Sequence, residues 1–257
     1  TSERRRVLLV GESNASGEDE GLYPKMALEV GADSPYRVDR ITPTSLNSES
    51  PEEAQLVIEP SVTAIAESSR QWLTDCAQAG GTVLIAAGKD TAATDGRCAL
   101  ADVQPVGWIE SPADSGTYQT LADVDLRNVI FASFRGPGRG NFTALNFRAH
   151  LNVAPGPTSA ILATFDDGSP ALIERPIGKG RVLLWTTGLG PSVGNFPLRG
   201  LYVAWMRSIA ATAFASAESY RSLLVGDAAP LSGQPGETLA IHRPNGETVQ
   251  ATLDAEG

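Results

Sequence analysis

The sequence is poor in several residue types that define particular protein classes. Its 257 residues include two cysteines, two histidines and two methionines, and aromatic residues make up 6%. Two cysteines allow at most one bridge, which excludes a disulfide-dense scaffold. No stretch approaches the roughly 20 uninterrupted apolar residues that would span a bilayer. The 20 Lys and Arg against 30 Asp and Glu give a formal net charge of −10. Such a charge repels nucleic-acid phosphates and anionic lipids, so we expect neither as a partner.

The composition is otherwise that of a chain with a real core, since 42% of its residues are hydrophobic. The first half alternates strand and helix signals. Short apolar runs lie at 7–10, 55–58 and 82–87, and apolar residues recur at helical spacing between 61 and 77. This order predicts an open, mostly parallel sheet with helices on both faces.

The pattern weakens between residues 89 and 157, where Gly, Pro, Asp and Ser are scattered. A structureless loop of that length is uncommon in a compact domain. We therefore interpret this stretch as an insertion with small strands of its own, near 106–109 and 129–131, or as a cap over one edge of the sheet.

Regular patterns return in the last hundred residues. Two linked hairpins are predicted, the first turning at 166–168, and a long helix follows over about 198–217. In residues 221–257 short strand signals alternate with Pro and Gly turns, which predicts the start of a truncated β-sandwich. Because both ends of the chain look cut, we expect a piece of a longer protein.

Four short motifs in the second half form a recognisable combination with Gly80-Gly81 and the strand after it. They are Asp166-Asp167-Gly168-Ser169-Pro170-Ala171-Leu172, Gly178-Lys179-Gly180-Arg181-Val182-Leu183-Leu184, Thr187-Gly188-Leu189 and Pro197-Leu198-Arg199. The combination spans residues 7–217 and resembles the class I glutamine amidotransferase-like domain of BatA-type bacterial membrane proteins, the aerotolerance proteins that contain a von Willebrand factor A domain.

The resemblance implies a three-layer, flavodoxin-like α/β domain over residues 1–220, interrupted by the insertion and followed by the β-sandwich segment at 221–257. It also implies sibling domains of the parent chain, or another protein, as partners. Membrane contact would come through the parent's other segments. The expected location is the extracytoplasmic side of the bacterial inner membrane.

The chemistry of true class I amidotransferases is missing from this sequence. Those enzymes place a cysteine nucleophile on a Gly-x-Cys-x-Gly elbow and bring in a His and a Glu later. Here the strand 82–87 and Gly88 occupy the elbow's place without a cysteine, and the only histidines, His150 and His242, form no His-x-Glu pair. A thiolate with a positioned base cannot be assembled from these residues. We therefore predict no catalytic residue, no cofactor and a non-catalytic interaction or scaffold module.

A group of polar residues follows the predicted parallel strands. Glu12 and Ser13 come after the first strand, Glu59 after another, and Gly88 and Lys89 after the strand that replaces the elbow. Open α/β folds bind ligands at the carboxyl ends of such strands, so these residues form a candidate ligand edge. The alternative is that they cap neighbouring helices and pair with each other.

A second function class stays open, a hydrolase or a domain that binds a small ligand, a sugar or a peptide, at the same edge. Ser192 lies in a Gly-x-Ser-x-Gly sequence and is a weak alternative nucleophile, because an elbow serine belongs directly at the end of a strand. Glu12 and Glu59 are the alternative carboxylate pair. His150 has no second ligand at metal spacing, so we predict no metal site and a surface or interface position for this histidine.

Overall fold

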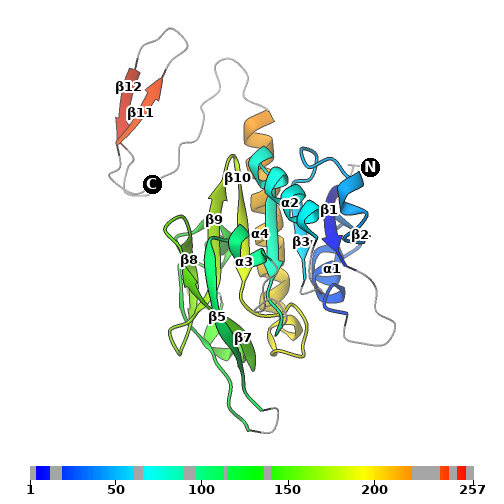
Figure 1. The fold of residues 1–257 in the computed structure, drawn as a ribbon, viewed down its shortest axis with the longest axis vertical. Coiled ribbons are helices and arrows are strands. Elements are labelled where there is room, and N and C mark those ends of the chain that lie inside the picture. The colour runs from blue at the N-terminus through cyan, green and yellow to red at the C-terminus, as the bar shows by residue number, and fades with distance from the viewer. Residues whose placement is uncertain are drawn as a thin grey trace. The chain divides into compact units, whose positions relative to one another are not determined.

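A computed structural model describes residues 4–11, 19–60, 66–89, 96–112, 115–135, 140–221, 238–242 and 248–252. The chain divides into two compact units, Thr1–Ala217 and Glu218–Gly257. The first unit is built around one eight-stranded sheet (Figure 1).

The order of strands in this sheet is β2-β1-β3-β4-β10-β9-β8-β6. The strands are β1 (Arg5–Val10), β2 (Tyr36–Ile41), β3 (Leu56–Glu59), β4 (Thr82–Ala86), β6 (Leu121–Val124), β8 (Ala160–Phe165), β9 (Pro170–Ile177) and β10 (Gly180–Trp185). Neighbours pair in parallel from β2 to β10 and antiparallel from β10 to β6. The predicted mostly parallel α/β sheet is confirmed.

Helices and a second small sheet cover both faces. The helices are α1 (Leu22–Glu29), α2 (Glu67–Ala79), α3 (Arg97–Leu100) and α4 (Gly200–Arg221), with 3-10 turns η1 (Leu46–Ser48), η3 (Val129–Phe134), η4 (Phe142–Ala144) and η5 (Phe196–Leu198). The small antiparallel sheet pairs β5 (Val103–Glu110) with β7 (Ala149–Pro155). In Figure 1, α2 lies on one side of the main sheet and α4 on the other. The three-layer arrangement is therefore confirmed.

Each face of the main sheet has its own hydrophobic core. Along β1, Val7 and Leu9 join the core beneath α1 and α4, whereas Leu8 and Val10 join the core beneath α2, α3 and the small sheet. Alternate side chains of a strand point to opposite faces, so a continuous apolar run is what a strand covered on both sides requires.

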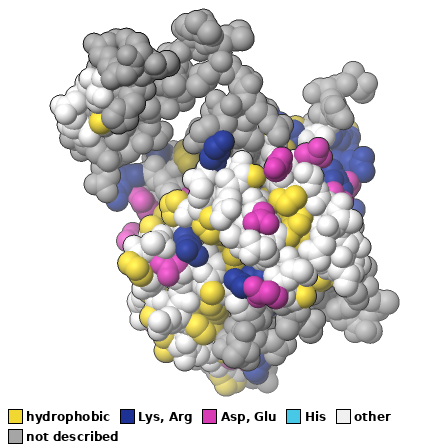
Figure 2. Space-filling view, turned by 45° about the horizontal axis from the view of Figure 1, so that its top comes forward, with side chains coloured by type: hydrophobic (Ala, Val, Ile, Leu, Met, Phe, Trp, Pro, Cys, Tyr) yellow, Lys and Arg dark blue, Asp and Glu magenta, His cyan; other side chains and the backbone are white. Residues whose placement is uncertain are grey.

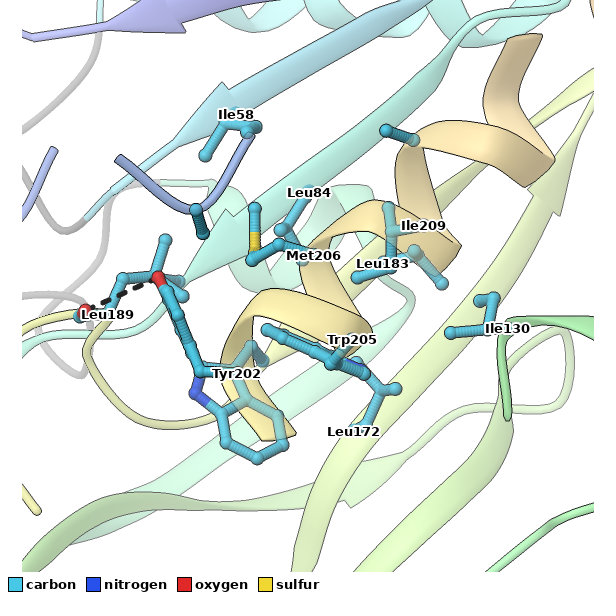
Figure 3. Close-up of a cluster of buried hydrophobic side chains, with 14 of the residues drawn as sticks. Ile58, Leu84, Ile130, Leu172, Leu183, Leu189, Tyr202, Trp205, Met206 and Ile209 are labelled. Atoms are coloured by element: carbon cyan, nitrogen blue, oxygen red, sulfur yellow. Dashed lines mark hydrogen bonds between the residues drawn. The ribbon is translucent and has the colours of Figure 1, made fainter. Parts of the chain in front are cut away.

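The long helix α4 supplies several of the largest side chains of its core. Figure 3 shows Trp205 and Met206 directed from α4 toward the sheet, where Leu84 and Leu183 lie, and Tyr202 directed toward Leu189. All six are at least 98% buried. Burying one side chain of this size fully stabilises the fold by about 1.5–3 kcal/mol, so the contact of α4 with the sheet is a major source of stability.

The insertion differs from its sequence prediction in two respects. The strand expected near residues 129–131 is wrong, because this segment forms the 3-10 turn η3, with the Asn128 side chain accepting a hydrogen bond from the Ile130 amide at 3.0 Å. The capping side chain favours a helical turn over a strand. The strand β6, from the same insertion, is an edge strand of the main sheet.

Charges of both signs are interspersed on the face seen in Figure 2. Ion pairs of the described surface include Arg6 with Asp39 and Arg37 with Asp39, each at 2.7 Å. Exposed pairs of this kind contribute at most about 1 kcal/mol each. This face therefore presents no broad field of one sign.

The second unit contains, among its described residues, the antiparallel hairpin of β11 (Thr238–His242) and β12 (Thr248–Thr252). The β-sandwich expected over 221–257 stays a prediction.

Candidate functional site

A pocket of about 340 Å³ lies where β4 ends. Ala87, Gly88 and Lys89 follow β4 directly and line it. The remaining lining comes from elsewhere in the chain: Glu20, Trp108, Glu110, Ser111, Arg148, Ala149, Ser192 and Val193. The pocket thus occupies the carboxyl edge of the parallel strands, as expected for an open α/β sheet.

Backbone hydrogen bonds hold the insertion over this edge. The Ser111 amide donates to the Arg148 carbonyl at 2.7 Å, which joins the end of β5 to the start of β7. The Arg148 amide donates in turn to the Val193 carbonyl at 2.7 Å. Three segments far apart in the sequence are thereby fixed as neighbouring walls of the pocket.

The carboxylate of Glu20 reaches the pocket from another segment of the chain, just before α1. Arg40 on β2 forms an ion pair with Asp19 at 2.8 Å, which places the next residue at the edge of the sheet. The Leu189 amide donates to Glu20 Oε2 at 3.4 Å. A Cβ on Gly188 would lie 2.9 Å from Glu20 Oε1, so a side chain at position 188 would displace the carboxylate from this place.

The loop that receives Glu20 is tied to the core. The Tyr202 hydroxyl of α4 donates to the Leu189 carbonyl at 3.4 Å, the dashed contact in Figure 3. Burial raises the pKa of Tyr202 well above its ordinary value, and the charge of Glu20 adds to that effect. Tyr202 therefore stays a neutral donor.

Charged side chains in the pocket are paired but accessible. Lys89 Nζ lies 3.0 Å from Glu110 Oε2, and Trp108 Nε1 donates to the same oxygen at 3.3 Å. The hydrogen bond and the charge of Lys89 lower the pKa of Glu110, with the indole contributing less. Arg148 Nη2 donates to the Ser192 carbonyl at 2.6 Å. Glu110 is therefore an ionised hydrogen-bond acceptor at neutral pH.

The structure brings some of the sequence-predicted edge residues together and separates others. Gly88, Lys89 and Ser192 line one pocket. Glu59 does not line it. Glu12 and Ser13 lie outside the described residues.

Glu59 is instead fully buried beneath the carboxyl edge of the sheet. Arg97 Nε and Nη2 each donate to one of its carboxylate oxygens at 2.8 Å, and both side chains are 0% exposed. Burial raises the pKa of Glu59 to about 7, an effect that the positive charge of Arg97 opposes. The alternative expectation is that the edge residues pair with each other, but Glu59 pairs with Arg97 and Lys89 pairs with Glu110.

The described residues offer no activated nucleophile in this pocket. No hydrogen bond there joins the Ser192 hydroxyl to a histidine or carboxylate. Cys76 and Cys98 are buried free thiols outside the pocket. Burial raises the pKa of Cys76 to about 12 and also raises that of Cys98, so neither is a thiolate at neutral pH. The described residues also contain no group of three or more His, Cys, Asp or Glu placed to hold a metal.

The expected surface position of His150 is wrong. It is 0% exposed, stacks on Phe165 at 4.5 Å between ring centroids, and places Nε2 2.8 Å from Ser169 Oγ and 3.3 Å from Asp167 Oδ2. Burial lowers the pKa of His150, against the opposing charge of Asp167. These contacts hold the turn between β8 and β9, and His150 does not line the pocket.

Apart from Lys89, sequence reasoning missed the charged and aromatic residues of the pocket, Glu20, Trp108, Glu110 and Arg148. Glu20 had a usable signal, because it lies between the first strand and the helix after it, on a loop that must cross the carboxyl edge. The other three come from the insertion. Their arrival at the edge depends on pairing between β5 and β7, which no local pattern revealed.

No protein-family model and no curated protein matches this sequence. Many solved structures are similar to this fold. The cytoplasmic protein STM1381 of Salmonella typhimurium LT2 has a TM-score of 0.61 and 14% identity, over 80% of this chain and 98% of that protein. A ThuA-like protein of Bacteroides uniformis has a TM-score of 0.56 and 11% identity, over 85% and 94%.

A third similar structure is the β-galactosidase of Rahnella sp. R3, with a TM-score of 0.58 and 14% identity. The match covers 83% of this chain but 31% of that enzyme, so it concerns one part of a much longer protein.

The expected extracytoplasmic location beside a membrane is contradicted. The similar structure STM1381, matched over nearly its whole length, is named a cytoplasmic protein. In the part of the chain that the structure describes, no helix is both long enough and apolar enough to span a bilayer.

Membership of the BatA-type proteins stays a prediction. At 11–14% identity the likenesses bear on architecture alone. They show that this chain has the fold of a flavodoxin-like, glutamine amidotransferase-like α/β domain.

Proposed function

We propose that this chain is a non-catalytic binding module that holds a neutral sugar in the pocket at the carboxyl edge. The observation that carries the proposal is the make-up of that pocket. It combines a partly buried indole, Trp108, with two carboxylates, Glu20 and Glu110, and two cations, Lys89 and Arg148.

This combination suits a ligand with many hydroxyl groups and no net charge. Carboxylates accept hydrogen bonds from hydroxyls, and ammonium or guanidinium groups donate to them. Charges of both signs around one pocket disfavour a ligand that carries either sign. An indole adds an apolar face with a polar edge, which matches the apolar C–H face and polar rim of a sugar ring.

Size and fold support the same ligand class. About 340 Å³ lies at the lower end of the range for small-molecule sites, which suits one sugar ring better than a dinucleotide. One structure that shares the fold is part of a β-galactosidase. Galactose is therefore the first sugar to test.

The protonation states of two carboxyl groups support binding without turnover. A general acid should have a pKa near the working pH. Glu110 has a lowered pKa, so it is ionised and unable to donate a proton. Glu59 has a suitable value of about 7 but is fully buried outside the pocket, so its proton cannot reach a ligand there.

The test uses intrinsic tryptophan fluorescence. Trp72, Trp185 and Trp205 are at least 94% buried, whereas Trp108 lines the pocket. Titration with galactose, glucose and mannose should change the emission of the wild-type protein with at least one sugar. Trp108→Phe should remove that response, and the matched control Trp72→Phe should keep it. A protein that responds to none of these sugars, or responds equally without Trp108, would contradict the proposal.

A parallel assay with p-nitrophenyl glycosides and esters addresses the hydrolase alternative. We expect no turnover above the uncatalysed rate. Turnover that disappears in Ser192→Ala or Glu20→Gln, while Met26→Ala retains it, would replace the binding module with an enzyme.

Protein docking is a second candidate, favoured by one surface feature. Leu22, Met26 and Val30 are 44%, 60% and 49% exposed and recur every four residues along and just beyond α1. Residues at this spacing share a helix face. This stripe is our candidate contact for a sibling domain of the parent chain. If so, Met26→Glu should abolish co-purification with that domain expressed separately, while Leu126→Glu, at another exposed leucine, should not.

A further inference from the structure

The carboxyl-edge pocket adjoins a second hollow. This hollow has a volume of about 320 Å³, and Arg148 lines both spaces. The loop 191–195 also contributes to both, some of its residues to one and some to the other. A ligand that filled the first pocket and extended past Arg148 would therefore enter the second.

The wall of the second hollow is held by a reciprocal set of hydrogen bonds. The Asn146 amide donates to Asn195 Oδ1 at 2.9 Å, and the Asn195 amide donates to the Asn146 carbonyl at 3.0 Å. Gly194 packs against the same carbonyl so closely that a Cβ there would lie 2.3 Å from the oxygen. The hollow is thus formed before any ligand arrives, which is usual for small-molecule sites.

The described residues that line the second hollow include an aromatic ring, as in the first pocket, but no acidic side chain. Tyr118 is 46% exposed and supplies an aromatic ring, as Trp108 does next door. Among the described residues, no hydrogen bond occupies the Tyr118 hydroxyl, the Thr117 hydroxyl or the Asn146 side-chain amide. Arg148 is the one charged side chain among the described residues that line this hollow. It therefore offers polar but mainly neutral contacts.

We propose that the two hollows are successive subsites for one linear, neutral oligosaccharide. One sugar unit lies beside Trp108, the next lies beside Tyr118, and Arg148 contacts both. The inference rests on the proposed function, since the first subsite is the sugar pocket. It goes further by naming the ligand as a chain of at least two units. A single sugar fills one hollow and leaves the Tyr118 contacts unused.

The test compares sugars of increasing length on the whole chain. A glycan array that carries mono- to hexasaccharides identifies the sugar series, and calorimetric titration then measures the affinity for each length. We expect affinity to rise on the order of tenfold from the monosaccharide to the di- or trisaccharide, about the effect of one added aromatic contact with its hydrogen bonds. Longer chains should add little.

Tyr118→Ala should cancel that gain and leave the affinity for the monosaccharide unchanged. Tyr118 is half-exposed, so the variant is expected to fold, and Tyr118→Phe should keep most of the gain because it keeps the ring. Leu126→Ala, which alters an exposed side chain that lines neither hollow, is the control and should match the wild type.

The possible failures are distinguishable. If mono- and oligosaccharides bind equally, or if Tyr118→Ala weakens both alike, the second subsite is wrong while the sugar pocket stands. If the array binds no glycan at all, the proposed function is wrong and the oligosaccharide site fails with it. If the protein binds peptides on an array and no glycans, the proposed function and the oligosaccharide site are likewise both wrong.

Discussion

The buried pair of Glu59 and Arg97 shows how a single residue at the sheet edge can be structural and still resemble a functional group. Each side chain is 0% exposed, and two parallel hydrogen bonds join them. Replacing a buried pair by apolar residues is often tolerated, but removing one partner leaves the other buried without compensation. The stability of the fold therefore depends on the presence of both residues.

Arg97→Ala should destabilise the protein by about 3–5 kcal/mol at pH 8, where Glu59 would have to stay ionised or take up a proton at a cost. The double variant Arg97→Met with Glu59→Leu should recover most of that loss. Urea unfolding of the three proteins measures the free energies. A single variant that unfolds at the wild-type midpoint would show that the pair contributes nothing.

The free energy of unfolding should depend on pH in a way that reflects the titration of Glu59. Its pKa is raised from 4.5 to about 7 in the folded chain, so the folded state holds the proton more tightly than the unfolded state. The contribution of this group is full below about pH 4.5 and is lost as the pH rises through 7. Comparing urea midpoints at pH 5 and pH 8 should show a smaller difference in Glu59→Gln than in the wild type. An equal difference would contradict the raised pKa.

Elements with strong local signals could be predicted from the sequence, and those that depend on distant partners could not. The helix α2 has apolar residues at helical spacing, the strand β4 is a continuous apolar run, and glycines lie between them. The hairpin of β8 and β9 has its Asp-Asp-Gly turn. By contrast, β5 pairs with β7 some 40 residues later, and that pairing is what carries Trp108 and Arg148 to the pocket. The sequence alone therefore predicts the sheet and the location of its edge, but only part of the site.

Two glycine motifs that stood out separately in the sequence are neighbours in the structure. The Arg181 amide, just after Gly180, donates to the Gly81 carbonyl at 3.1 Å. A Cβ on Gly180 would lie 2.1 Å from that same carbonyl oxygen and 2.6 Å from the Ala77 carbonyl oxygen. The end of α2 and the turn before β10 can therefore approach only because glycine is present.

Gly180→Ala should lower the free energy of unfolding by about 1–3 kcal/mol, the usual cost of overpacking against atoms that cannot move freely. Gly200→Ala is the matched control, because nothing lies within 4 Å of a Cβ there. Thermal unfolding monitored by circular dichroism should separate the two variants. Equal melting temperatures would contradict the close approach of the two backbones.

At the scale of the whole molecule, the fold suggests one function and the residues at the carboxyl edge of its sheet suggest another. The architecture is glutamine amidotransferase-like, and similar structures include a ThuA-like protein and part of a β-galactosidase. Yet the place of the nucleophile holds Ala87 and Gly88, and the insertion fills the edge with an indole and paired charges. A fold does not bring its chemistry with it, so function has to be argued from the site.

The measurement that tests the account most directly is an amide and indole NMR spectrum recorded with and without the sugar selected by fluorescence. The four tryptophans give four indole N–H signals. We predict that the signal of Trp108 shifts, together with the amides of Gly88, Lys89 and Ser111, while the indole signals of Trp72, Trp185 and Trp205 stay in place. Shifts confined to other parts of the chain, with Trp108 unchanged at saturating sugar, would contradict a ligand site at the carboxyl edge.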